Sequence, residues 1–278
     1  MTGNGERDRR KSVPFTLSKA LLDLQELAER LRHDCPWDRE QTAATIVPHT
    51  VEEAYEVADA VHAADPVKLV DELGDLLYQV YFLALLLDEE GTGDLERVAR
   101  SIHDKLVRRH PHVFQEAGEL DSPAEVKQRW EELKAIQEDR EGVFHHVPDS
   151  LPALLYARKV QRRAAAAGFE YPDHAGAFAD LQDEVRELAE AIEEHAAPPP
   201  ETEPHPRHME ELGDVLFAAV NIARHLNVDP ELALRWMTQR FVSRVERAQE
   251  LAAADGHQFG TVSLEEQDRY FDHAKEHE

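Results

Sequence analysis

The chain carries two copies of one acidic pattern, and this repeat constrains its fold more than any other feature. In the first copy Glu53 and Glu56 are three residues apart, and so are Glu72 and Asp75. The second copy repeats both spacings 131 and 139 residues further along, in the runs DEVRE and EELGD. Residues three apart lie on one face of an α-helix. The pattern therefore predicts paired helices that each carry acids on one face.

These paired acids also indicate metal chemistry. Two such helices packed antiparallel would bring four carboxylates together, and four anions repel one another unless a cation lies between them. Oxygen ligands with room for water or phosphate suit Mg²⁺ better than Ca²⁺, with Mn²⁺ as a substitute. One acidic cluster alone is usually a solvated helix face in so acidic a chain. The duplication, including the same Leu-Gly pair in DELGD and EELGD, favours a metal site in each copy.

Composition excludes several classes of protein. The 278 residues include 57 acids against 31 bases, a net charge of −26, which argues against binding to nucleic acid. The first residues contain no apolar stretch typical of a secretory signal. The longest apolar run, residues 80–87, is too short to span a bilayer. A single cysteine, Cys35, excludes an intrachain disulfide and fits a reducing cytoplasm. We therefore expect a cytoplasmic protein without membrane segments.

Helical periodicity dominates the chain, and no segment reads convincingly as a strand. We predict an all-α fold with an N-terminal domain over 1–115, a helical connector over 116–150 and a C-terminal domain over 151–278. Helices are expected near 15–32, 47–63, 65–90, 95–109, 123–138, 153–167, 175–196, 208–226 and 230–254, with a short one from 264. The Pro- and Glu-rich insert at 196–208 accounts for the extra length of the second copy.

Three helix ends have specific signals. Thr16 or Ser18 is expected to cap the first helix, and Pro48 to lie in the first turn of the second. Pro36 and Trp37 are expected to form a turn, with Trp37 packed in the core in preference to stacking on a nucleobase. His110, His112 and Cys35 lack the usual spacing of a zinc site, so we do not assign one.

Basic residues follow each acidic hairpin at a similar distance. Lys105 and Arg109 follow the first copy, and Arg240 and Arg244 follow the second. Each pair is four residues apart and would project from one helix face. Such bases are often only surface ion pairs of little energetic value. Beside a metal site, however, they can share the charge of a polyphosphate.

Several motifs together resemble the MazG nucleoside triphosphate pyrophosphohydrolases. The first half contains CPWDREQT, VEEAYEVADA, DELGDLLYQVYF and KLVRRHPHVF. The second half, with LPALLYARKVQRRAAAAGFE, DEVRELAEA, EELGDVLFAAVNIARHL and RFVSR, is similar to the C-terminal repeat of two-domain members. The resemblance covers roughly residues 17–250. It implies an all-α fold with two tandem helical-bundle domains, and a homodimer.

The resemblance also implies roles for residues. The implied metal ligands are Glu53, Glu56, Glu72, Asp75, Glu184, Glu187, Glu211 and Asp214. The implied catalytic acids, which orient or deprotonate the attacking water, are Glu52, Glu53, Asp183 and Glu184. The positions matching nucleotide contacts are Arg207, Arg240 and Arg244, with Phe271 as a base-stacking aromatic.

The implied reaction is hydrolysis of a nucleoside triphosphate between the α and β phosphates, giving a monophosphate and pyrophosphate. Three readings remain open: a broad pyrophosphohydrolase that removes surplus or damaged nucleotides, a narrow enzyme such as a dUTPase or phosphoribosyl-ATP hydrolase, and a nucleotide-sensing or interaction protein without turnover. The second copy departs from the family by having Asp183 in place of Glu and Asp180 where Lys is frequent. The active copy is therefore left open.

Overall fold

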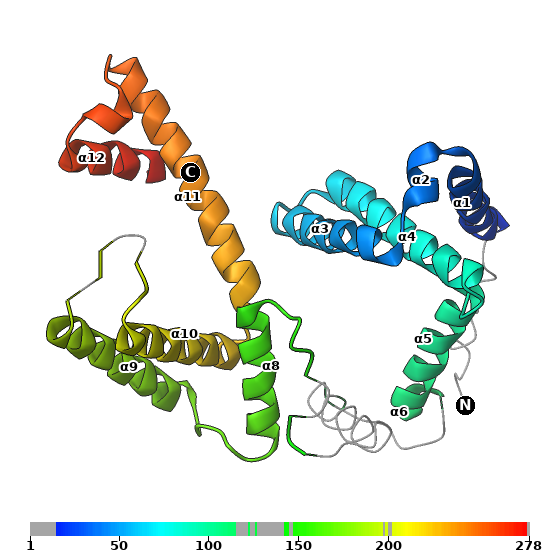
Figure 1. Ribbon diagram of the computed structural model, residues 1–278, viewed down its shortest axis with the longest axis horizontal. Coiled ribbons are helices and arrows are strands. Elements are labelled where there is room, and N and C mark those ends of the chain that lie inside the picture. Colours follow the sequence, from blue (N-terminus) through cyan, green and yellow to red (C-terminus); the bar gives the residue numbers. More distant parts are fainter. Residues whose placement is uncertain are drawn as a thin grey trace, which may run out of the picture. The chain divides into compact units, whose positions relative to one another are not determined.

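The described residues of this computed structural model are 15–114, 122, 126, 142–144, 147–196, 198–199 and 202–276. Within these ranges every regular element is a helix, as Figure 1 shows. The predicted all-α fold is thereby confirmed. The chain forms two compact units, residues 1–139 and 140–278. The helix expected at 123–138 lies almost wholly outside the described residues, so the extent of the connector stays a prediction.

Each unit has its own set of helices. The first unit contains α1 (Phe15–Asp34), α2 (Pro36–Glu40), α3 (Ala43–His62), α4 (Pro66–Glu89), α5 (Leu95–Arg109) and α6 (Pro111–Phe114). The second contains α8 (Ala153–Ala166), α9 (His174–Glu194), α10 (Pro206–His225), α11 (Pro230–Ala254), the 3₁₀-helix η1 (Phe259–Thr261) and α12 (Leu264–Lys275).

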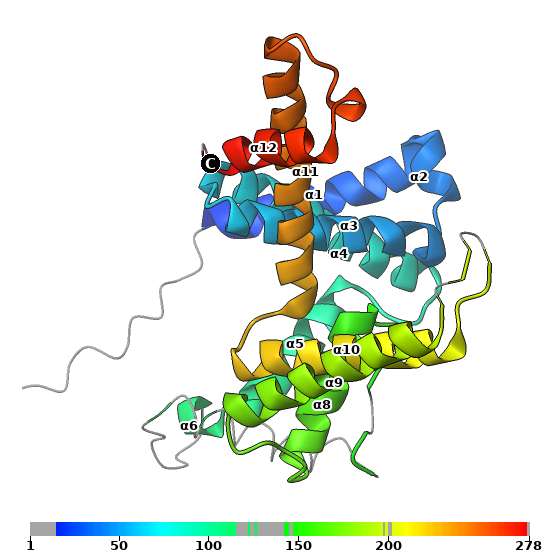
Figure 2. The same ribbon diagram turned by 90° about the vertical axis from the view of Figure 1, so that its left-hand side faces the viewer.

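The centre of the first unit is the antiparallel hairpin of α3 and α4, which lie side by side in both views (Figures 1 and 2). The Asp65 side chain caps α4 by accepting from the N–H groups of Val67 and Lys68 at 2.9 and 3.0 Å. Pro66 is tolerated at the first helical position because that N–H has no partner within a helix. Three residues thus suffice to reverse the chain, and the two acid-bearing helices are forced together.

Two helix starts differ from the predictions. The helix α1 begins at Phe15, so Thr16 and Ser18 lie inside it and do not cap it. The helix α3 begins at Ala43, five residues before Pro48, which lies in its interior. There Thr42 and Thr45 form a reciprocal capping box, which satisfies two backbone donors and offsets the hydrogen bond that Pro48 cannot make.

The turn expected at Pro36 is instead the short helix α2, which Arg32 fixes in place. The Arg32 guanidinium donates to the backbone carbonyls of Asp38 and Gln41 and forms a bidentate ion pair with Glu89, at 2.8 Å for each nitrogen. This arginine therefore joins α1, α2 and the end of α4. Trp37, expected in the core, is 55% exposed, and the buried cluster of the first unit consists of Ile46, Phe82 and Leu86.

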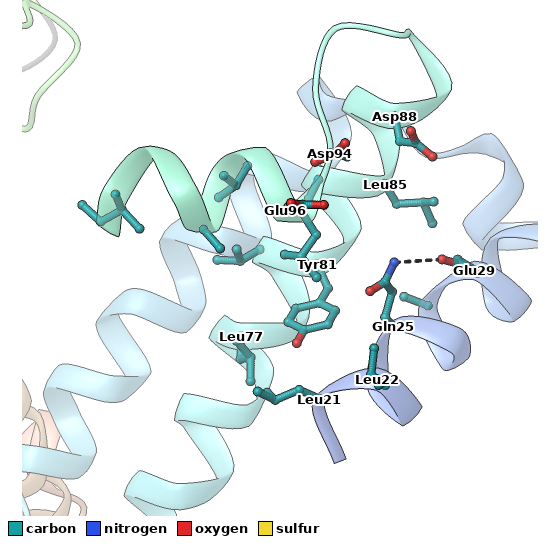
Figure 3. A pocket seen from close by; sticks show the side chains of 17 residues that line it. Leu21, Leu22, Gln25, Glu29, Leu77, Tyr81, Leu85, Asp88, Asp94 and Glu96 are labelled. Carbon is teal, nitrogen blue, oxygen red and sulfur yellow. Dashed lines mark hydrogen bonds between the residues drawn. The ribbon is translucent and has the colours of Figure 1, made fainter. Parts of the chain in front are cut away.

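A mostly apolar groove of about 810 Å³ lies between α1, α4 and α5. Leu21, Leu22, Leu77 and Tyr81 point into it, as Figure 3 shows, and the Gln25–Glu29 hydrogen bond of 3.1 Å lies on its wall. The leucines of α1 therefore form a stripe along one side of the helix, and this stripe is only partly covered within the first unit.

The second unit repeats the hairpin with α9 and α10 and adds α8 against it. The Gln161 side chain donates to the Phe217 carbonyl at 2.8 Å, which fixes α8 to α10. The helix α10 begins at Pro206, two residues before the expected start, because the His205 ring accepts from the Arg207 N–H at 3.3 Å. The long α11 extends away from the hairpin, and α12 packs along its far part (Figure 1).

None of the described helices is both long enough and apolar enough to cross a bilayer.

Candidate functional site

The α3–α4 hairpin brings three of the predicted ligands of the first copy together. Ligand oxygens of Glu53, Glu56 and Glu72 all lie within 4.8 Å of one another. Glu53 and Glu56 come from one face of α3, as their spacing predicts, and Glu72 faces them from α4. Asp75, one turn further along α4, is close enough to Glu53 to repel it electrostatically. All four predicted carboxylates thus contribute negative charge to one place.

The second copy builds a related cluster on α9 and α10. Here ligand oxygens of Glu184, Glu211 and Asp214 lie within 4.8 Å of one another, and Glu187 adds negative charge beside Glu184. Glu211 is only 1% exposed, and its Oε2 atom is buried without a hydrogen-bond partner. A buried polar oxygen without a hydrogen-bond partner is costly. This second oxygen of Glu211 is therefore available to a ligand.

The crowding of these acids changes their protonation. Burial raises the pKa of Glu53 above its ordinary value, and the nearby Asp75 and Glu56 raise it further. Burial likewise raises the pKa of Glu184, with added repulsion from Asp214 and Glu187. Both shifts have the cause expected when like charges share a poorly solvated site. The same position in each copy therefore has a raised pKa.

These donor sets fit a hard divalent cation. Every candidate ligand atom is a carboxylate oxygen, the donor that Mg²⁺ and Mn²⁺ prefer. The unpartnered Glu211 oxygen and the mutual repulsion in both clusters are problems that a divalent cation would remove. Glu53, Glu56 and Glu72 in the first copy, and Glu184, Glu211 and Asp214 in the second, are the residues that would hold it.

Each cluster also has a basic side chain four residues before its most buried glutamate. Lys68 Nζ lies 3.7 Å from Glu72 Oε1, and Arg207 lies 2.7 Å from Glu211 Oε1. The sequence analysis did not single out Lys68. The signal was available, because Lys68 and Arg207 are separated by the same 139 residues as Glu72 and Glu211. The repeat therefore includes a cation beside each acid cluster.

Two predicted catalytic acids have other partners on their own helices. Glu52 Oε2 is 3.2 Å from His49 Nδ1, and Asp183 forms a 2.9 Å ion pair with Arg186. Both carboxylates are well exposed. In each copy the second acid of the pair, Glu53 or Glu184, is the one that enters the cluster.

The remaining predicted contacts lie on other helices. Lys105 and Arg109 are on α5, which follows α4 after a turn and packs against it. Glu72 and Asp75, in contrast, lie in the N-terminal half of α4. Arg240 and Arg244 are on α11, and Phe271 on α12 packs against Phe241 with ring centroids 5.6 Å apart. Figure 1 shows α11 extending away from the α9–α10 hairpin, with α12 beside the far part of α11. Among the predicted basic residues, Arg207 forms an ion pair with a cluster glutamate, Glu211.

Comparison with known proteins decides the family. The profile described as the MazG nucleotide pyrophosphohydrolase domain matches twice, at residues 41–114 and 173–250. The chain belongs to the MazG family. Each match contains one of the two acid-bearing hairpins, so the family signal and the metal-binding geometry coincide. The predicted MazG resemblance and the predicted enzyme class, a hydrolase acting on acid anhydrides, are confirmed.

Relatives in this family match over nearly the whole chain. The nucleoside triphosphate pyrophosphohydrolase/pyrophosphatase MazG of Thermotoga maritima is 37% identical over 91% of this chain and 94% of its own length. The nucleoside triphosphate pyrophosphohydrolase of Escherichia coli K12 is 38% identical over 91% of this chain and 95% of its own. The two-domain MazG architecture is therefore shared along the chain, including the interval between the hairpins.

Proton competition should make cation binding depend on pH in both MazG domains. Because the pKa values of Glu53 and Glu184 are raised above the ordinary 4.5, protons displace the cation at a higher pH than for an isolated glutamate. We expect the apparent Mg²⁺ affinity, measured by calorimetry, to fall well before the pH reaches 4.5. Without Mg²⁺ the raised pKa values affect the stability of the fold. Glu53 and Glu184 bind protons more tightly in the folded state, so their contribution to the free energy of unfolding is present at low pH and is lost as pH rises through the raised pKa.

The matched control is the double variant Glu53→Gln with Glu184→Gln, in which neither position can titrate. Its residual Mg²⁺ affinity should be weaker and should change less between about pH 5 and pH 8. A wild-type affinity that stays constant down to pH 4.5 would contradict the raised pKa values.

Proposed function

We propose that this chain hydrolyses nucleoside triphosphates and deoxynucleoside triphosphates, with Mg²⁺, to the monophosphate and pyrophosphate. The observation that carries the proposal is the duplicated hairpin, in which clustered carboxylates with a partner cation occur inside each MazG match. Its relatives in T. maritima and E. coli are named for this reaction. Removal of surplus or damaged nucleotides from a cytoplasmic pool is the role we infer.

The residues of each cluster have separable tasks. When bound, Mg²⁺ would lower the pKa of a coordinated water and neutralise phosphate charge. Glu72 and Glu211, the most buried acids, would hold that cation. Glu53 and Glu184, which belong to the same ligand groups and have raised pKa values, would also accept a proton from the water that attacks the α phosphorus. Lys68 and Arg207 offset part of the negative charge of the clusters through their ion pairs with Glu72 and Glu211.

Exposed apolar stripes on both hairpins support assembly into a homodimer. On α4, exposed apolar residues recur at intervals of three and four, and they include Val70, Leu73, Leu77 and Val80. On α9 and α10 they include Phe178, Val185 and Ile192, spaced by seven, and Met209, Leu212 and Leu216. This spacing is typical of a seam between packed helices. A second copy of the chain that covers these stripes would complete a helical bundle.

The glycines of the two Leu-Gly pairs support the same arrangement. A Cβ added at Gly74 or Gly213 would meet nothing within 4 Å in the single chain. Glycine inside a helix destabilises it by roughly 0.5–1 kcal/mol relative to alanine, so local helix stability does not explain either residue. Close approach of a partner helix or of substrate would explain why glycine occurs at both positions. The partner copy would also be the source of basic side chains such as Arg240 and Arg244 for the phosphates.

The proposed reaction is tested by its products. Purified protein with Mg²⁺ should release pyrophosphate and monophosphate in equal amounts from a panel of NTPs and dNTPs, measured by anion-exchange chromatography. Chelation of the metal should abolish the release, and Mn²⁺ should restore it. Activity confined to one nucleotide would identify a narrow enzyme.

Two results would contradict the proposal. Release of orthophosphate in place of pyrophosphate would mean that a different anhydride bond is cleaved. Tight nucleotide binding without any turnover would favour the alternative, a nucleotide-sensing or interaction protein.

A further inference from the structure

An exposed tryptophan stands beside the acid cluster of the first unit and has no part in the reaction described above. Trp37 projects from α2 with 55% of its surface exposed, although tryptophan is on average a highly buried residue. The proline-flanked stretch that forms α2, residues 35–42, occurs before the first hairpin and is not repeated before the second. This indole is therefore a feature of one copy only.

The backbone that carries Trp37 is held firmly. The Gln41 side chain donates to the Trp37 carbonyl at 2.9 Å, and the Arg32 guanidinium donates to the carbonyls of Asp38 and Gln41. Asp38 is 6% exposed and anchors the inner side of α2. The short helix that carries the indole is therefore held by the Gln41 and Arg32 hydrogen bonds and by the buried Asp38. The exposure of Trp37 does not come from a loose loop.

The indole contacts α3, the helix that carries two of the cluster carboxylates. The rings of Trp37 and His49 are 6.3 Å apart between centroids and inclined at 61°, an edge-to-face arrangement that is favourable for aromatic pairs. His49 Nδ1 lies 3.2 Å from Glu52 Oε2. Along α3, His49 precedes Glu53 by four residues, so the two share a face about 6 Å apart along the axis. The indole and the cluster therefore lie on the same side of α3.

A nucleoside triphosphate has two ends with different requirements. Its polyphosphate is repelled by bare carboxylates and needs a cation between them, whereas its base is a flat aromatic ring that stacks on exposed aromatic side chains. The first unit offers these two surfaces next to each other: the Glu53, Glu56 and Glu72 cluster and the Trp37 indole. His49 contacts the indole at one edge-to-face junction, and much of the ring stays open.

We propose that Trp37 stacks on the base of a nucleoside triphosphate whose phosphates are bound at the first-copy carboxylates, with His49 as a positioning residue for the indole. This inference rests on the proposed function, because it takes the cluster as the place of the phosphates. Stacking accepts any base, since every base has a π face. The first copy therefore binds purine and pyrimidine nucleotides alike, and the second copy lacks this contact.

Fluorescence of Trp37 tests the contact directly. The full chain with Trp130→Phe and Trp236→Phe retains Trp37 as its one tryptophan. The analogue α,β-methylene-ATP cannot be cleaved between the α and β phosphates. Titration with this analogue in the presence of Mg²⁺ should quench the emission of Trp37. Inorganic tripolyphosphate with Mg²⁺, which has no base, should bind with little quenching. Equal emission with both ligands bound would overturn the proposal. Acrylamide, a neutral quencher, measures whether the indole is accessible, and an indole that a second copy of the chain shields from acrylamide would also overturn the proposal.

Affinity gives the second readout, in a background where Glu184→Gln and Glu211→Gln disable the second copy. Trp37→Ala should weaken binding of α,β-methylene-ATP by about five- to 150-fold, while Trp37→Phe restores most of it. Tripolyphosphate affinity should be unchanged in both, which separates base stacking from a folding defect. Equal loss for both ligands, or no loss for either, would overturn the proposal.

These outcomes are distinguishable from failure of the proposed function. If the protein with Trp37 as its one tryptophan quenches and binds as expected but the wild type releases no pyrophosphate, the stacking inference stands and the hydrolytic proposal fails. If pyrophosphate is released but Trp37→Ala binds α,β-methylene-ATP as the parent background does, the hydrolytic proposal stands and the stacking inference fails.

Discussion

Replacing Glu72 and Glu211 together by glutamine should abolish pyrophosphate release with Mg²⁺. These are the most buried acids of the two clusters, at 8% and 1% exposed, and each provides an oxygen within 4.8 Å of two other carboxylates. Glutamine keeps the volume and one carbonyl oxygen but removes the charge that attracts the cation. Loss of even an outer-shell partner of a metal ligand typically costs about 10- to 100-fold, so loss of a ligand in both copies should exceed about 100-fold.

The single variants identify the working copy. If Glu211→Gln alone removes the activity and Glu72→Gln does not, the second unit carries out hydrolysis and the first has another role. Glu40→Gln and Glu193→Gln, at exposed positions outside both clusters, are the matched controls and should retain full activity. Undiminished release by the Glu72→Gln, Glu211→Gln double variant would refute the assignment of both metal centres.

Stability measurements separate loss of the metal from loss of the fold. The charged acids repel one another in the empty site, so the double variant should melt without Mg²⁺ at the wild-type temperature or above it. Added Mg²⁺ should stabilise the wild type, by about 2.7 kcal/mol at 100 times the dissociation constant, and stabilise the variant much less. A variant that melts far below wild type in the absence of Mg²⁺ would point to a structural role for the two glutamates.

The parts of the fold that the sequence predicts well are those decided by local chemistry. The helices α5 and α11 have the expected bounds because Asp94 and Asp229 cap them, and α4 begins at Pro66 after the Asp65 cap. An acceptor side chain before a helix satisfies backbone donors whatever surrounds it. The acid spacing on α3 and α4 is equally local, so the convergence of Glu53, Glu56 and Glu72 follows from periodicity and a short turn.

The misassignments concern competition between signals and contacts distant in sequence. At α3 a proline and a capping box gave conflicting starts, and the two hydrogen bonds of Thr42 and Thr45 prevailed. The exposure of Trp37 depends on Arg32 and Glu89, 57 residues apart, which hold α2 in its orientation. The ion pair of Lys68 with Glu72 was visible in the repeat, but one lysine in a charged chain has no local signal that separates it from a solvated surface.

Aspartate in the centre of the apolar stripes should convert the protein to a monomer. Leu77 on α4 and Leu216 on α10 are 38% and 51% exposed in the single chain, within rows of apolar side chains at helical spacing. In a two-fold symmetric dimer each substitution occurs twice in the interface. Removing water from an unpaired carboxylate costs about 3–5 kcal/mol. The wild type should sediment at the mass of a dimer, and the double variant Leu77→Asp with Leu216→Asp should sediment at the mass of a monomer.

Leu264→Asp is the control for this experiment, because it makes the same chemical change at a leucine that is 72% exposed and begins α12, a helix that carries neither stripe. It should leave the dimer intact, so a general effect of added charge would be recognised. Activity then reports what the partner supplies: a folded monomer with lower pyrophosphate release means that the clusters need side chains from the second copy. A wild-type protein that is monomeric and fully active at micromolar concentration would instead show that one chain completes its own sites.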